Sequence, residues 1–162
     1  MKVIAFCDIH GHVHNLMKLV PIMERADVAL FLGDGEAALE TLPHHILKKL
    51  FAVGGNVDLF TRLPNEMVLE IGGVKFFATH GHMYGVKSGF DRIFHVAKEN
   101  DARVVLWGHR HESYRETRDG IQMIGVPPLG ETRTREGSSY VEIILDSQKA
   151  LVTSIAFRRL PR

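Results

Sequence analysis

The feature that most limits the fold of this chain is a series of short apolar runs that end abruptly in polar residues. Residues 2–7, 28–32 and 50–53 form three such runs, with the composition of buried strands. Apolar residues at helical spacing occupy 15–25 between the first two runs. A helix is also expected at 37–50 before the third run, with Pro43 near its start or at a break. Alternation of strands and helices predicts a parallel sheet with right-handed crossover connections.

The pattern changes after residue 53. Two further strands, 67–71 and 74–79, are joined by two glycines, which favours an antiparallel hairpin. A helix is expected at 86–100 and a buried strand at 103–107, and the rest of the chain reads as four strands: 113–118, 121–125, 139–145 and 150–157. We therefore expect one domain over residues 1–162, with an α/β half followed by a more antiparallel half.

Composition excludes several classes of protein. The chain has 45% hydrophobic and 24% charged residues, as in an ordinary globular protein. A net charge of +1 argues against a dedicated nucleic-acid surface, although residues 103–162 hold most of the arginines. The single cysteine, Cys7, excludes an internal disulfide and is expected to be a small buried residue. No apolar run has the length of a signal peptide or membrane span, so we expect a cytoplasmic protein without a membrane partner.

Potential metal ligands follow five of the expected strands. Because ligands of open α/β sheets bind outside the carboxyl ends of the strands, these side chains are expected to meet at one site. They are Asp8 and His10, Asp34, Asn56, His80 and His82, and His109 and His111. A single Asp or His in such a place is usually a turn or core residue, but clusters at all five strand ends indicate a metal site.

Two pairs, Asp8 with His10 and His109 with His111, are spaced two residues apart. On an extended backbone such pairs point to one face, and so deliver two ligands to one pocket or one ligand to each of two metals. The intervening Arg110 is then expected at the surface or behind the ligands. Carboxylate, imidazole and amide groups without thiolate suit Mn, Fe, Co, Ni or Zn, and the set is too large for one tetrahedral ion.

The ordered motifs DIH, GDGE, GGNVD, THGH and GHRH resemble those of the calcineurin-like metallophosphoesterases, most closely the small bacterial and archaeal phosphodiesterases. The resemblance extends from residue 1 to about residue 145. It implies a four-layer α/β/β/α sandwich, in which two mixed β-sheets are flanked by helices.

The resemblance also implies a ligand set for two divalent transition-metal ions (Mn, Fe, Ni, Co or Zn). One ion would be held by Asp8, His10 and His111, the other by Asn56, His80 and His109, and Asp34 would bridge them. Two such ions can bind the oxygens of a phosphoryl group, lower the pKa of a bridging water and stabilise in-line attack by the resulting hydroxide.

The chain departs from the family pattern at Val57, where many phosphomonoesterases have a histidine that contacts phosphate or protonates the leaving group. Its absence favours diesters, or aryl esters with good leaving groups. His82 and His12 are candidate catalytic replacements, with a structural role as the alternative for each. Asp58 is expected to orient the loop of Asn56.

Residues 125–130 are expected to form a tight loop near the site, and the two arginines that follow, Arg133 and Arg135, are candidates for a substrate phosphate contact or for solvent exposure.

The resulting hypothesis is a metal-dependent phosphodiesterase acting on small phosphodiesters, nucleotides among them. The alternatives are a non-catalytic protein-interaction scaffold of the same fold, like the retromer subunit that resembles these enzymes, or a small phosphatase or nuclease. The expected partner is a small phosphoester substrate, and the resemblance adds self-association into a homo-oligomer as a further expectation.

Overall fold

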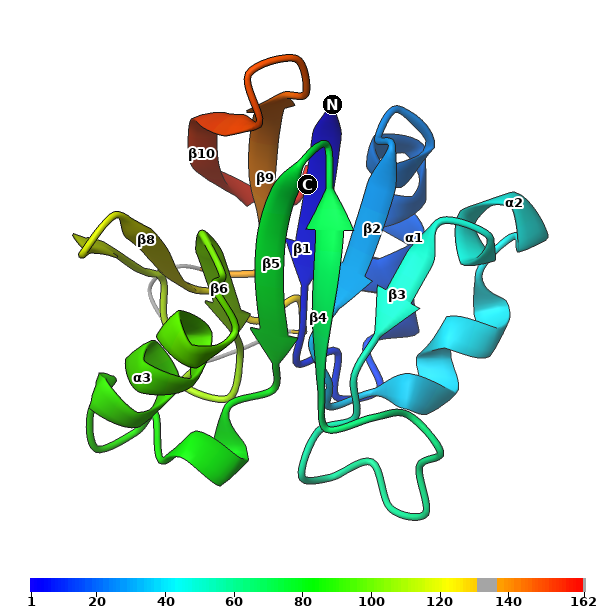
Figure 1. Ribbon diagram of the computed structural model, residues 1–162. Coiled ribbons are helices and arrows are strands. Elements are labelled where there is room, and N and C mark those ends of the chain that lie inside the picture. The colour runs from blue at the N-terminus through cyan, green and yellow to red at the C-terminus, as the bar shows by residue number, and fades with distance from the viewer. Residues whose placement is uncertain (131–136, 162) are drawn as a thin grey trace.

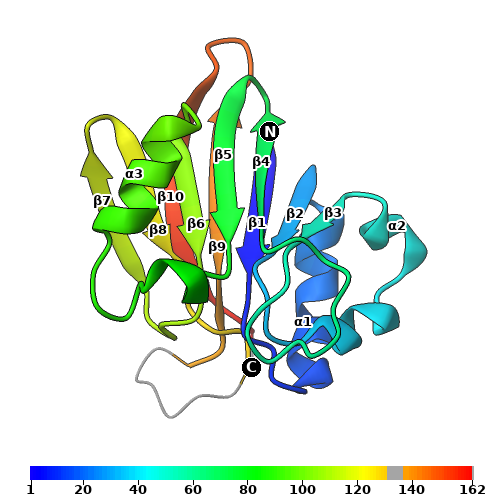
Figure 2. The same ribbon diagram turned by 60° about the horizontal axis from the view of Figure 1, so that its bottom comes forward.

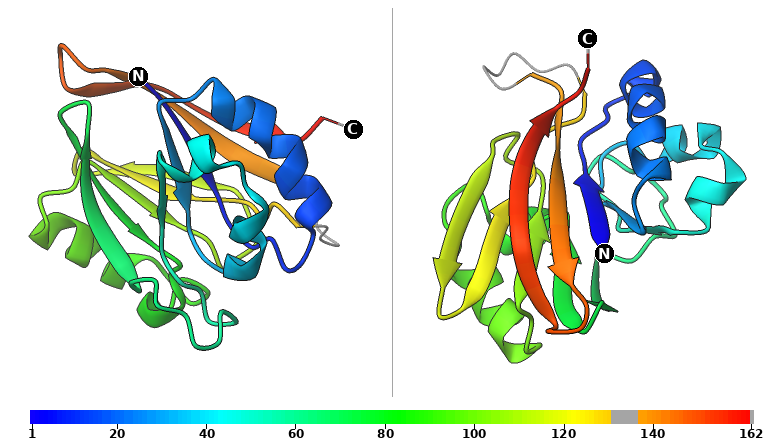
Figure 3. Two further views of the ribbon diagram at one scale, coloured as in Figure 1. Left: turned by 90° about the vertical axis from the view of Figure 1, so that its right-hand side faces the viewer. Right: turned by 90° about the horizontal axis from the view of Figure 1, so that it is seen from above.

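A computed structural model describes residues 1–130 and 137–161 of the chain. Two five-stranded sheets pack face to face, and helices cover the outer face of each sheet (Figure 1). Figure 3 shows the four layers from the side and from above. The expected α/β/β/α sandwich with two mixed sheets is therefore confirmed.

The first sheet has the strand order β10-β9-β1-β2-β3. Its first three strands in the sequence are parallel, as the alternation of strands and helices predicts. Strand β9 is antiparallel to β1, and β10 is antiparallel to β9. This sheet and its helices comprise β1 (Lys2–Phe6), α1 (Val13–Glu24), β2 (Val28–Phe31), η1 (Glu36–Thr41), α2 (His44–Leu47), β3 (Leu50–Ala52), β9 (Ser139–Asp146) and β10 (Leu151–Arg159).

The second sheet has the order β4-β5-β6-β8-β7. The hairpin of β4 and β5 forms as expected, β5, β6 and β8 are parallel, and β7 is antiparallel to β8. The elements are β4 (Glu66–Ile71), β5 (Val74–Thr79), η2 (His82–Tyr84), α3 (Asp91–Glu99), β6 (Val104–Trp107), β7 (Tyr114–Arg118) and β8 (Ile121–Gly125).

Alternation of side chains along the strands divides the core between three interlayer spaces. In β1, Val3 and Ala5 face the second sheet, where they join Phe76 and Leu106 in one apolar cluster. The intervening Ile4 and Phe6 face α1 and pack with Leu16, Leu19 and Met23. On the outer side of the second sheet, Phe77, Val105 and Trp107 pack with Ile93, Phe94 and Ala97 of α3. Both faces of β1, β2 and β6 are covered, which explains why these strands are continuously apolar.

Two expected helices are shorter in the structure. The helical region expected at 37–50 consists of the 3-10 helix η1 and the single turn α2, which are separated at the expected break. The break lies at Pro43, which has no N–H to donate and forces Leu42 into an extended conformation with ψ of 142°. The helix expected at 86–100 begins only at Asp91, because the preceding residues form turns that include Gly85 at φ of 62°.

The carboxyl ends of β1, β2, β5 and β6 lie at the same end of the two sheets, which is the lower end in Figure 1. Figure 2 turns this end toward the viewer, and the long connection from β3 to β4 lies there too. No helix among the described residues is long and apolar enough to cross a membrane.

Candidate metal centre

The structure brings the potential ligands at the strand ends together in two neighbouring groups. Asp8, His10 and His111 form one group, and Asp34, His80 and His109 form the other. Within each group the ligand atoms lie within 4.8 Å of one another. The groups adjoin, because Nε2 of His10 lies 3.9 Å from Oδ2 of Asp34.

The first group is built around the fully buried carboxylate of Asp8. Its Oδ1 lies 3.0 Å from Nε2 of His111 and 3.5 Å from Nε2 of His10, and these two ring nitrogens are 3.3 Å apart. The other oxygen, Oδ2, accepts the backbone N–H of His109 at 3.1 Å. Burial by itself raises the pKa of Asp8, but hydrogen bonds with His10 and His111 and the charge of His80 outweigh it, and the pKa falls well below its usual range. Asp8 is therefore an anion at neutral pH.

The second group contains His80, which is fully buried. Its Nδ1 donates to the carbonyl of Leu32 at 2.7 Å, so Nε2 is left to face Asn56 Oδ1 at 3.0 Å and Asp34 Oδ2 at 3.3 Å. A histidine that binds a metal through one nitrogen usually donates from the other in this way. Burial lowers the pKa of His80, but Asp34 and Asp8 outweigh burial and the pKa is raised.

His109 completes this group as a neutral imidazole. Burial, and then the charge of His80, lower its pKa to about 4. A neutral ring is the form that coordinates a cation, so His109 needs no loss of a proton at pH 7.

Asp34 lies between the two groups. Oδ2 faces both His80 and His10, whereas Oδ1 accepts the backbone N–H of Val57 at 3.0 Å. Burial raises the pKa of Asp34, but the hydrogen bonds from His80 and Val57 outweigh it and the pKa is lowered. Asp34 thus contacts ligand atoms of both groups, and its role as a bridge between two metals stays a prediction.

Asp58 fixes the backbone on both sides of Asp34. Its Oδ2 accepts the N–H groups of Asp34 and Gly55, each at 2.8 Å, and its Oδ1 accepts those of Gly35 and Glu36 at 2.7 and 2.9 Å. The sequence analysis placed Asp58 only on the loop of Asn56. In the structure Asp58 also accepts hydrogen bonds from the loop after β2. The spacing of the motifs in the sequence does not predict this contact.

The expectation of an extended backbone at the two spaced pairs is wrong. Asp8 and His10 have φ of 52° and 46°, and His109 and His111 have φ of 65° and 59°. Left-handed conformations are rare for residues other than glycine and cluster at functional sites. The turns send His111 to the group of Asp8 and His109 to the group of Asp34, which is the arrangement of one ligand for each of two metals.

Gly55 allows the loops after β2 and β3 to touch. A Cβ atom at this position would lie 2.0 Å from Oδ1 of Asp34 and 2.4 Å from its backbone nitrogen. Only glycine fits such a close approach, which explains the glycine directly before Asn56.

The two candidate catalytic histidines occupy different places. The ring of His82 lies beside those of His80 and His109, with centroids 5.4 and 6.2 Å away, and its Nδ1 is buried without a partner among the described residues. Burial, and then the charge of His80, lower the pKa of His82, so the ring is neutral at pH 7. His12 lies next to Gly130, whose N–H donates to the carbonyl of Asp8. A catalytic role for either histidine stays a prediction.

Other residues singled out from the sequence surround the site. Arg110 is half-buried and donates to the carbonyl of Val86 at 3.1 Å and to Glu112 at 2.8 Å, behind the ligands. Cys7 is buried, as expected. The expected tight loop at 125–130 does lie near the site, because Gly130 N–H donates to the carbonyl of Asp8 at 2.9 Å. Arg133 and Arg135 lie outside the described residues.

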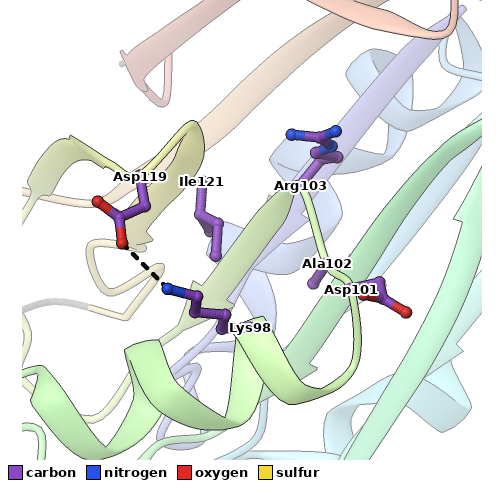
Figure 4. Close-up of a pocket in the computed structure, with 6 residues that line it drawn as sticks. All are labelled: Lys98, Asp101, Ala102, Arg103, Asp119 and Ile121. Atoms are coloured by element: carbon purple, nitrogen blue, oxygen red, sulfur yellow. Dashed lines mark hydrogen bonds and ion pairs between the residues drawn. The ribbon is translucent and has the colours of Figure 1, made fainter.

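A separate hollow of about 230 Å³ is lined by Lys98, Asp101, Arg103 and Asp119 (Figure 4). It adjoins the start of β6, whereas His109 follows the end of that strand. Lys98 pairs there with Asp119 at 3.2 Å. This hollow therefore takes no part in the candidate metal centre.

The donor atoms present suit the metals of the expected family. Oxygen and imidazole nitrogen converge from two sides without thiolate, which favours Mn, Fe, Co, Ni or Zn over softer ions. Without a cation, the ring nitrogens of His10 and His111 face each other across one carboxylate oxygen. A cation placed between these two nitrogens and the carboxylate oxygen would have all three atoms as ligands, so the residues fit a metal ion.

Comparison with known proteins identifies the family. The family model of the calcineurin-like phosphoesterase superfamily domain matches residues 1–148, and this chain belongs to that family. The probable metallophosphoesterase YsnB of Bacillus subtilis is 32% identical over 152 residues, which covers 94% of this chain and 89% of YsnB. A phosphodiesterase of Methanocaldococcus jannaschii is 27% identical over 173 residues, covering 90% of this chain and 100% of the relative.

Solved structures agree in fold. A conserved uncharacterised protein of Streptococcus pneumoniae, a predicted phosphoesterase, superposes with a TM-score of 0.77 at 22% identity, over 90% of this chain and 83% of that one. Vps29 of Entamoeba histolytica, in a complex with zinc, gives a TM-score of 0.73 at 17% identity, over 98% and 97% of the two chains. The resemblance inferred from the five motifs is thus confirmed.

Proposed function

We propose that the chain is a metal-dependent phosphodiesterase that hydrolyses small phosphodiesters, nucleotides among them. The observation that carries the proposal is the pair of adjoining ligand groups on either side of Asp34. Membership of the metallophosphoesterase family and the likeness to a phosphodiesterase support it.

In this proposal seven side chains hold two divalent transition-metal ions: Asp8, His10, Asp34, Asn56, His80, His109 and His111. When bound, such ions act as Lewis acids on the phosphoryl oxygens and generate a nucleophile from water at neutral pH. Hydrogen bonds within the chain hold these ligands in position. Leu32 fixes the ring of His80, Val57 N–H fixes one oxygen of Asp34, and Asp58 fixes the loops that carry Asp34 and Asn56.

The preference for diesters, and for good leaving groups, rests on the absence of a histidine at position 57 that could contact the extra phosphate oxygen of a monoester or protonate a leaving group. Val57 is half-exposed beside Asp34, where a histidine of the phosphomonoesterases would stand, and it cannot donate a proton. His82 is a candidate donor beside the ligands, but burial, and then the charge of His80, lower its pKa and disfavour the protonated ring. A stable leaving group is then required, and the ester oxygen of an aryl or activated diester provides one.

A non-catalytic scaffold is the second candidate function, because Vps29 shares the fold. At 17% identity that likeness concerns the fold alone. A scaffold needs no convergence of seven ligands, two of them with fully buried side chains. The candidate metal centre therefore favours the enzyme.

The test is hydrolysis of bis-p-nitrophenyl phosphate and of p-nitrophenyl phosphate by protein stripped with chelator and then supplied with Mn, Fe, Ni, Co, Zn or Mg. We expect metal-dependent release of nitrophenolate from the diester and much slower release from the monoester. Absence of turnover of either ester with every metal would contradict the proposal and favour the scaffold.

A further inference from the structure

A pocket of about 550 Å³ adjoins the candidate metal centre through His10. We call it the side pocket, and its walls include His10, Glu36, Glu40, Val57, Asp58 and Leu59. Pockets of about 300–1,000 Å³ are the usual size for small-molecule ligands. A diester held at the metal centre could therefore extend one of its two arms into this space.

One wall of the side pocket is apolar and exposed, so that a ligand can pack against it. Val57 and Leu59 are 50% and 79% exposed, respectively, although both are apolar. Exposed apolar side chains gain free energy when a flat or aliphatic group covers them. This wall favours an uncharged ring over a strongly hydrated group.

The other wall is acidic. Glu36 and Glu40 line it, and neither carboxylate has a hydrogen-bond or ion-pair partner within the described part of the chain. Asp58 differs, since its two oxygens already accept four backbone N–H groups. The free carboxylates can accept hydrogen bonds from hydroxyl or N–H groups, and they repel a second phosphate.

Asp58 holds both walls of the side pocket in place. The N–H of Glu36 donates to Asp58, and Gly55, just before the apolar wall, donates to the other oxygen of that carboxylate. Binding to such a preformed pocket loses little free energy to ordering of the protein.

We propose that the side pocket binds a nucleoside that forms one arm of the diester substrate. A base offers an apolar face to Val57 and Leu59, and base N–H and sugar hydroxyl groups are donors for Glu36 and Glu40. The inference rests on the proposed function and narrows it. Nucleoside polyphosphates and polynucleotides, which place further negative charge beside the glutamates, are excluded as preferred substrates.

The test compares two diesters that release the same nitrophenolate, thymidine 5′-(p-nitrophenyl phosphate) and bis-p-nitrophenyl phosphate. In both, water attacks phosphorus, the bond to the aryl oxygen breaks, and the other arm stays esterified. The measured quantity is the ratio of kcat/KM for the nucleoside ester to that for the bis-aryl ester. The variants are Glu36→Ala and Glu40→Ala, with Glu99→Ala as the matched control on an exposed position of α3.

We expect each pocket variant to lower the ratio by about tenfold, as for the loss of one hydrogen bond to a charged acceptor. Glu99→Ala should keep the wild-type ratio. An unchanged ratio in both pocket variants would overturn the nucleoside assignment while leaving the phosphodiesterase in place. p-Nitrophenyl phosphorylcholine, whose second arm is cationic, is the third probe. The nucleoside assignment would also be overturned if kcat/KM for this ester exceeded that for the nucleoside ester and if Glu36→Ala or Glu40→Ala removed the difference. Failure of the proposed function is distinct, because the wild-type protein would then hydrolyse none of the three.

Discussion

The fourfold hydrogen bonding of Asp58 gives a quantitative prediction for Asp58→Asn. In the variant an NH₂ group replaces one carboxylate oxygen, and it must face two backbone N–H donors instead of accepting from them. A hydrogen bond to a charged group contributes about 1.5–3 kcal/mol. Two such bonds correspond to about 3–6 kcal/mol. Because Asp58 is half-buried and water can replace part of the lost interaction, we expect a loss at the lower end of this sum, about 3 kcal/mol.

The assays are thermal unfolding and metal titration of the same sample. A chain of this size loses about 2–4 °C in Tm for each 1 kcal/mol, so Asp58→Asn should lower Tm by about 6–12 °C. Because both loops carry proposed ligands, metal affinity should fall by about 10- to 100-fold.

Asp146→Asn is the control for this experiment. Asp146 also accepts two backbone N–H groups, those of Gln148 and Lys149 at 3.0 and 3.1 Å, but it lies in the turn between β9 and β10. This variant should lose some stability and keep its metal affinity. If Asp58→Asn retained both the wild-type Tm and the wild-type affinity, the reasoning about the two loops would be refuted.

Three further predictions concern single positions near the site. Val57→His should raise hydrolysis of p-nitrophenyl phosphate relative to its bis-aryl diester, because an imidazole beside Asp34 can contact the additional unesterified phosphate oxygen that only the monoester carries, whereas both esters release the same nitrophenolate without a proton; an unchanged ratio of the two kcat/KM values would contradict the argument. Gly55→Ala should abolish metal binding and lower Tm, since the new Cβ would lie 2.0 Å from Asp34 Oδ1, whereas Gly89→Ala, with no atom within 4 Å of the new Cβ, should do neither. Burial, and then the charge of Asp8, raise the pKa of the Cys7 thiol well above its usual range. The folded protein should therefore not react with Ellman's reagent at pH 8, whereas the urea-unfolded protein should react with one equivalent. Rapid reaction of the folded protein would contradict this, because it would show that the thiol is accessible.

The residues that end the strands could be found from the sequence because two physical rules apply to them. Continuous apolar runs locate buried strands, and the carboxyl ends of parallel strands share one edge of a sheet. Asp8 and His80 follow such runs directly, Asp34 and His109 follow after one glycine, and the structure brings all four together. The hairpin at Gly72 and Gly73 was found by the same local reasoning.

Features set by long-range contacts could not be found in this way. The left-handed conformations of Asp8 and His111 depend on packing between loops that are about a hundred residues apart, and no local preference predicts them. The contact of Asp58 with the loop after β2 and the acidic wall at Glu36 are likewise products of tertiary packing. The break at Pro43 could be anticipated from the proline itself, but the 3-10 conformation of η1 could not be predicted from its apolar spacing.

The most direct test of the proposed metal pair is a count of ions. Chelator-stripped protein is equilibrated with Mn²⁺, freed of unbound metal and analysed by mass spectrometry of the elements, with Asp34→Asn and the exposed control Asp27→Asn in parallel. We predict two ions per chain and diester hydrolysis for the wild-type protein and for Asp27→Asn, and fewer than two ions with no hydrolysis for folded Asp34→Asn. Two ions per chain and normal turnover in Asp34→Asn would contradict the assignment of Asp34 as the residue shared by both metals.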